Sequence, residues 1–216
     1  MGLLLAFPQN DGEPTMTKTI LQLCADTGSD TQVYRDNGYN VILIGSAIGV
    51  ENYHPPADTY GIIANPVCTE FSIATGFHNR GDHEKGLFLV RECQRIIAEC
   101  NPYFWVIENP ASGKLKDYLG KPTMTYEPWH FGSPWTKRTA LWGHFNKPER
   151  IYQEWDDVPK LPLYTRPGRP KPSLAFLHKS AVKLIPEFAD FSPDSDMEFR
   201  SLCSQGFAQA FYEVNQ

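Results

Sequence analysis

The chain has 216 residues, of which 41% are hydrophobic and 21% are charged, close to ordinary globular usage, so a disordered or fibrous chain is excluded. This length favours one domain with a sizeable core, alone or with a small appendage, over two full domains. A net charge of −5 gives no overall attraction to nucleic acid, so any contact with DNA must come from a local patch.

The chain contains no run of 18 apolar residues, and the Met1–Phe7 run is too short and too uncharged for a secretory signal. The five cysteines are odd in number and lack a paired C-x-x-C spacing, which is typical of buried thiols in a reducing compartment. We therefore expect a cytoplasmic protein with no metal site, no membrane contact and no obligate protein partner.

Apolar runs and helical periodicity alternate along most of the chain. After a lead-in over residues 1–18, the pattern predicts a strand, a tight loop, a helix and a second strand, with Thr19–Leu23, Cys24–Ser29 and Tyr39–Ile44 as the strand, the loop and the second strand. Two more apolar runs, Tyr60–Ala64 and Phe104–Ile107, predict strands that end in polar residues. Between them, Lys85–Cys100 has the spacing of an amphipathic helix that Asn101-Pro102 ends.

Strands that alternate with helices predict an α/β fold, in which a mostly parallel sheet has helices on both faces and binds ligands at the carboxyl ends of its strands. Thr139–Trp142 is a further strand candidate. We expect a core over residues 19–150, a small segment over 151–190 and a C-terminal helix over 191–216 that returns to the core. Its apolar stripe consists of Met197, Leu202, Phe207 and Phe211.

Residues 159–186 form a local basic segment on an acidic protein. They are rich in proline and carry six cations, with no acid before Glu187. Composition alone leaves two interpretations open, a solvated linker without a partner or a patch that contacts DNA phosphates.

Three side chains that could carry chemistry are expected near the ends of predicted strands. Cys68 follows one strand in a turn that contains proline, Glu108 follows the next, and Arg138 precedes the Thr139–Trp142 run. Each also has a plain structural interpretation, respectively a buried thiol, a helix cap and half of a surface pair. Together they are the groups that activate a pyrimidine for substitution at carbon 5, because a thiolate adds to carbon 6, an acid protonates N3 and a cation steadies both.

At this point the sequence resembles the C5-cytosine DNA methyltransferases, and in particular the short methyltransferase-like proteins of bacterial viruses. Five segments carry the resemblance in the family's order: the glycine loop after the first strand, the nucleophile loop, the Glu-Asn motif, the arginine-containing motif and the closing motif that packs under the cofactor. They are Leu21–Ser29, Asn65–Ser72, Val106–Pro110, Phe131–Gly143 and Gln205–Phe211.

The resemblance implies a Rossmann-like class I methyltransferase fold, S-adenosylmethionine as cofactor and methyl transfer to C5 of cytosine in DNA. It also implies that Cys68 forms a covalent adduct with C6, that Glu108 orients and protonates the base and that Arg138 supports it. The implied cofactor contacts are Cys24, Ala25, Asp26, Thr27, Gly28, Ser29, Gly45 and Pro66. The implied substrate contacts are Ser72, Asn109, Arg166, Arg169 and Lys171, with the 151–190 segment in place of a target-recognition domain.

The sequence departs from the family on the cofactor side. Gln22 and Gly45 stand where the family has acids, Val67 replaces the proline before the nucleophile, and Glu51 and Asp58 are the candidates to compensate. Two hypotheses therefore remain: an enzyme that methylates cytosine, or a catalytically silent or altered-cofactor protein of the same fold. The expected partner is DNA, single- or double-stranded, or a cytosine nucleotide, inside a bacterial host cell if the protein is viral.

Overall fold

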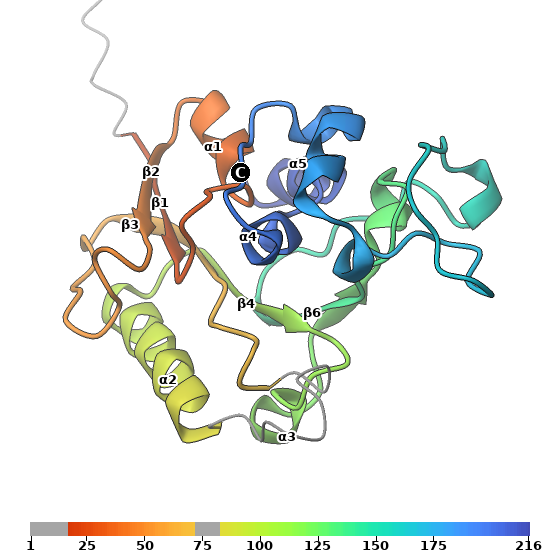
Figure 1. The fold of residues 1–216 in the computed structure, drawn as a ribbon. Coiled ribbons are helices and arrows are strands. Elements are labelled where there is room, and N and C mark those ends of the chain that lie inside the picture. The colour runs from red at the N-terminus through yellow and green to blue at the C-terminus, as the bar shows by residue number, and fades with distance from the viewer. Residues whose placement is uncertain (1–16, 72–82) are drawn as a thin grey trace, which may run out of the picture.

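The computed structural model describes residues 17–71 and 83–216, so Ser72 and most of the expected lead-in lie outside the described residues. Within the described part, one six-stranded sheet has the order β2-β1-β3-β4-β6-β5 (Figure 1). Its strands are β1 Thr19–Leu23, β2 Asn40–Ile44, β3 Thr59–Ala64, β4 Phe104–Pro110, β5 Met124–Tyr126 and β6 Thr139–His144.

Strands β1 to β4 pair in parallel, whereas β6 runs antiparallel to both β4 and β5. The α-helices are α1 Gln32–Asp36, α2 His83–Cys100, α3 Lys116–Leu119, α4 Asp196–Ser201 and α5 Gln205–Val214. A mostly parallel sheet enclosed by helices is a Rossmann-like α/β fold, so the predicted fold class is confirmed.

The core lies in two layers because alternate residues of each strand face opposite sides of the sheet. On one face, Leu21 and Ile62 pack against Leu87 and Ile96 of α2. On the other face, Ile20 of β1 joins side chains of α1 and α5 in a second cluster. Figure 1 shows α2 on one side of the sheet, with α1 and α5 on the other.

The predicted strands and the long helix are present, and their ends follow local backbone chemistry. Helix α2 ends before Asn101, whose φ of 44° lies in the left-handed region that asparagine tolerates, and Pro102 cannot continue the helix. The three-residue strand β5 has no counterpart in the sequence prediction.

The expectation of one C-terminal helix from Asp196 is wrong. The chain leaves the helical conformation over residues 202–204, and Ser204 starts α5 afresh by accepting a hydrogen bond from the Phe207 amide at 3.3 Å. Met197, assigned to the apolar stripe, is 71% exposed, whereas Leu202 and Phe207 are buried. Two short helices, α4 and α5, therefore replace the single predicted helix.

The basic segment is folded and packed, so it is not a loose linker; its contact with DNA stays a prediction. The 3-10 turns in and beside it are η3 Trp155–Asp157, η4 Leu174–Phe176, η5 Lys179–Leu184 and η6 Pro186–Phe188. Leu174, Ile185 and Phe188 pack with Trp135 and Phe199 in a third buried cluster beside the sheet. In the described residues, no helix is both long and apolar enough to cross a membrane, and no three metal-ligating side chains gather at one point.

Candidate functional site

A polar cluster joins the carboxyl ends of β1, β3 and β4. The Asn65 amide nitrogen lies 3.3 Å from Asp30 Oδ1 and 3.4 Å from Glu108 Oε2, so it bridges the two carboxyls. Gln22 donates to Asp30 Oδ2 at 3.0 Å and accepts from the Thr31 hydroxyl at 2.6 Å. Neighbouring parallel strands bring these side chains to one edge of the sheet, where open α/β sheets place their ligands.

Burial is the first cause that raises the pKa of both carboxyls, since it disfavours their charged forms. The nearby Asp30 charge raises the pKa of Glu108 further, whereas the Lys137 ammonium opposes the shift in both groups. Two coupled carboxyls that share one amide favour a state in which one of them keeps its proton. The cluster can therefore hold a proton donor at the strand ends.

Cys68 lies on the loop that continues β3, within the electrostatic reach of Glu108. Burial first, and the Glu108 charge second, raise the pKa of the Cys68 thiol, whereas Lys137 lowers it. Its carbonyl accepts from the Phe71 amide at 3.1 Å, which closes a turn. Asn109, 1% exposed, donates to the Pro66 carbonyl at 2.9 Å. We infer that Asn109 braces the nucleophile loop, whereas the resemblance implied a substrate contact.

Lys137, and not its neighbour Arg138, is the cation that acts on this cluster. The Lys137 ammonium donates to the carbonyls of Ser201 and Leu202, each at 3.2 Å, and its charge lowers the pKa of the Cys68 thiol and the Glu108 carboxyl. Arg138 is exposed, and its charge acts on Glu127 near the basic segment. The two side chains diverge because successive residues of an extended chain face opposite sides.

This difference gives a prediction for thiol reactivity. Lys137→Met removes the charge that favours the Cys68 thiolate, so alkylation of Cys68 by iodoacetamide should slow and its pH profile should move upward. A rise of one pKa unit would lower the thiolate fraction about tenfold. Arg138→Met is the matched control and should leave the profile unchanged, as measured by peptide mass spectrometry. Equal effects of the two variants would contradict the assignment of Lys137.

The expected cofactor loop, residues 24–29, is tied to its surroundings on both sides. Asp26 Oδ1 accepts from the Ser46 amide at 2.8 Å, and Ser29 Oγ accepts from the Cys203 amide at 3.0 Å. Gly28 has a φ of 70°, which favours glycine. A Cβ on Gly45 would lie 1.9 Å from Asp26 Oδ1, so a larger residue there would displace the Asp26 side chain.

This geometry fits the loop ends of a nucleoside-binding cradle. The Asp26 carboxylate is exposed and stands against the end of β2 at Gly45, where the sequence lacks an acid. A carboxylate there can accept hydrogen bonds from vicinal hydroxyls. Of the other expected contacts, Pro66 is buried and Cys24 is 3.7 Å from Cys93, sulfur to sulfur. Ala25 and Thr27 lie in the same half-buried loop.

Comparison with known proteins finds similarity only among solved structures. No protein-family model matches the chain, and no curated protein matches it. One similar solved structure is a prophage-encoded E. coli protein described as a candidate DNA modification methyltransferase, with 14% identity and a TM-score of 0.43. The similarity covers 59% of this chain and 47% of the other, so the chain matches about half of that protein's length.

The structure brings Cys68 and Glu108 into one cluster, whereas Arg166, Arg169 and Lys171 line a separate pocket. A cavity of about 20 Å³ lies among Asp30, Glu108 and apolar side chains of α5, room for one water and not for a base. Sequence reasoning missed Asp30, Asn65 and Lys137. Strand parity would have identified Lys137, whereas no local signal places Asp30 beside Glu108.

Proposed function

We propose that this protein is a C5-cytosine DNA methyltransferase that acts through a covalent adduct between Cys68 and C6 of the base. The proposal is supported above all by one observation: Asn65 bridges Asp30 and Glu108 at the strand ends, where the Glu108 carboxyl, whose pKa burial raises, lies within electrostatic reach of the Cys68 thiol. General acids near neutral pH need a carboxyl with such a raised pKa.

In the proposed reaction, the Cys68 thiolate adds to C6 while Glu108 gives its proton to N3, which makes C5 nucleophilic. After substitution, a water molecule takes the C5 proton, the C6–S bond breaks to release the Cys68 thiolate, and N3 returns its proton to Glu108, which restores the ring. Glu108 also favours the nucleophile when it is protonated. Ionised Glu108 would raise the pKa of Cys68, whereas the neutral acid has no charge to do so. Lys137 stabilises the thiolate, and Asn65 orients Glu108. S-adenosylmethionine, when bound, supplies an electrophilic methyl group.

Incubation with S-adenosylmethionine labelled in its methyl group tests the proposal directly. Label should enter DNA and, after digestion, appear as 5-methylcytosine in chromatography. Since the target sequence is open, the substrate should be a long unmodified DNA, offered both as duplex and as heat-denatured strands. Binding of DNA without binding of the cofactor would support the alternative, a catalytically silent or altered-cofactor protein. The absence of acids at Gln22 and Gly45 favours that alternative.

Asp26 provides a prediction for the cofactor site. In this proposal the Asp26 carboxylate accepts hydrogen bonds from the ribose hydroxyls. Asp26→Asn should therefore lower the affinity for S-adenosylhomocysteine by about tenfold or more, since a charged hydrogen bond is lost. Asparagine can still accept from the Ser46 amide, so the loop should keep its shape. Titration calorimetry measures the affinity, with the exposed acid Asp36→Asn as control. Unchanged affinity in Asp26→Asn would remove this role.

A further inference from the structure

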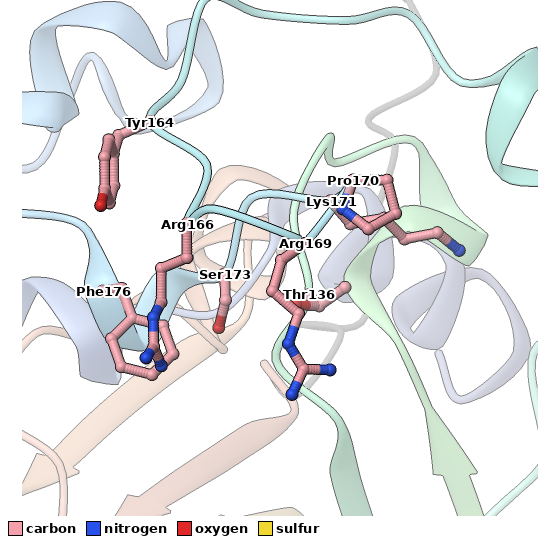
Figure 2. A pocket seen from close by; sticks show the side chains of 8 residues that line it. All are labelled: Thr136, Tyr164, Arg166, Arg169, Pro170, Lys171, Ser173 and Phe176. Carbon is pink, nitrogen blue, oxygen red and sulfur yellow. The ribbon is translucent and has the colours of Figure 1, made fainter.

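A pocket of about 400 Å³ in the basic segment is lined by basic side chains. Its size falls within the range of about 300–1,000 Å³ of small-molecule sites. Figure 2 shows the Arg166 side chain lying against Phe176, with Arg169 and Ser173 beside them and Tyr164 on the neighbouring wall. The pocket is therefore lined by two guanidinium groups and two aromatic rings.

The two arginines occupy the ends of one tight turn. Residues 166–169 read Arg-Pro-Gly-Arg, the Arg169 amide donates to the Arg166 carbonyl at 2.9 Å, and Gly168 has a φ of 73°. Proline followed by glycine with positive φ is the pattern of a type II turn, so little backbone freedom remains to be lost on binding. The turn presents both guanidinium groups in a fixed relation.

The pocket's charge is uncompensated within its walls. Its lining contains no carboxylate, and in the described ranges neither Arg166 nor Arg169 takes part in an ion pair within 4.0 Å. The Arg166 guanidinium carbon lies 4.3 Å from the centroid of the Phe176 ring, which is 51% exposed. A guanidinium stacked on a ring offers its other face to a planar ligand, and a free guanidinium suits a phosphate.

The pocket is connected through the chain to the site of the proposed chemistry. Thr136 forms part of its wall and is held to the basic segment, since its amide donates to the Pro172 carbonyl at 2.9 Å and its carbonyl accepts from the Leu174 amide at 3.1 Å. The next residue, Lys137, acts on Glu108 and Cys68. The consecutive residues Thr136 and Lys137 thus connect the pocket with the polar cluster.

We propose that this pocket binds one unpaired nucleotide of the DNA strand, next to the target base, with the base stacked on Arg166 and a phosphate held by Arg169. The inference rests on the proposed function, because that function identifies the neighbouring base as the target cytosine. The binding of a nucleotide in the pocket does not depend on any reaction and can be measured alone. A pocket of this size admits one nucleotide and excludes a duplex, so the strand must be locally open there.

Fluorescence anisotropy with two labelled 12-mer single strands tests the binding step without cofactor. One strand carries mixed bases, and the other carries the same phosphates with abasic sugars throughout. Arg166→Lys keeps the charge and loses the planar face of the guanidinium. It should lower the affinity for the base-containing strand about fivefold or more and leave the affinity for the abasic strand nearly unchanged. Arg169→Ala should lower the affinity for both strands alike. It should also reduce the slope of log affinity against log salt concentration by about 0.7.

Lys183→Ala is the matched control, an exposed cation of the same segment outside the pocket, and should not separate the two strands. Equal losses for both strands in Arg166→Lys would overturn the stacking, as would equal affinity of the two strands for the parent. These results leave methyl transfer untouched, so the proposed function can survive them. A photo-crosslinkable 5-iodouracil beside a cytosine analogue trapped on Cys68 should label Tyr164 or Phe176, and labelling elsewhere would refute the adjacency.

Discussion

A DNA strand that contains 5-fluorocytosine will stay attached to the parent protein under denaturing conditions, and Cys68→Ser will abolish the attachment. With S-adenosylmethionine present, C5 then carries both the methyl group and fluorine, which cannot leave as a proton does, so the covalent intermediate accumulates. Serine at this position has no comparable acidity, and loss of a nucleophile typically costs at least about 10³-fold in rate. Gel mobility and peptide mass spectrometry of the labelled band measure the adduct and its position.

The cysteine Cys100 provides the control, since it is also half-buried but lies at the end of α2. Cys100→Ser should form the adduct at the parent rate. An adduct that persists in Cys68→Ser would refute the nucleophile, whatever the methyl transfer assay shows.

Glu108→Gln will slow methyl transfer by about 10²-fold or more and, at neutral pH, raise the free energy of unfolding. The rate falls because the amide cannot give a proton to N3. Stability rises because burial lifts the folded-state pKa of Glu108 above its unfolded value, so the unfolded chain loses this proton first and stability declines as pH rises from about 4.5 toward the folded pKa. Glutamine carries no such penalty.

Melting curves at about pH 4 and at pH 7.5 separate these effects, because the parent and the variant should differ much less at the lower pH, where the carboxyl is largely protonated in both states. Glu187→Gln is the control for a buried carboxyl, since burial also raises the pKa of Glu187, which contacts Ser133 and Gln205 away from the cluster. That variant should keep its activity within about threefold. An unchanged rate in Glu108→Gln would exclude this proton donor.

The strands of the sheet were predictable because each is a short apolar run whose end is marked by polar residues or proline. Tertiary contacts decide what remained hidden. The strand β5 has only three residues, and its assignment depends on pairing with β6, which no local pattern reveals. The break between α4 and α5 follows from Ser204 as a new cap, a signal that the apolar spacing obscured.

The candidate site was predictable in its parts and not in its partners. Cys68 and Glu108 follow directly from their places after apolar runs. Asn65 bridges Asp30 and Glu108 but is 35 residues from Asp30 and 43 from Glu108, so sequence distance concealed the bridge. Arg138 carried the resemblance, whereas the charge that lowers the pKa of the Cys68 thiol is that of Lys137.

The bond from the Cys203 amide to Ser29 spans 174 residues, and the Gln205 side chain adds a second bond to the Ser29 carbonyl at 3.0 Å. The loop after the first strand is therefore completed by residues that follow it by 174 and 176 positions in the chain. Closing so long a loop is slow, and it makes formation of the cradle a late event in folding. A chain that lacks residues 203–205 can pair β1 with β3 but lacks both of these bonds, so the protein cannot present this loop to a ligand until those residues have joined the fold.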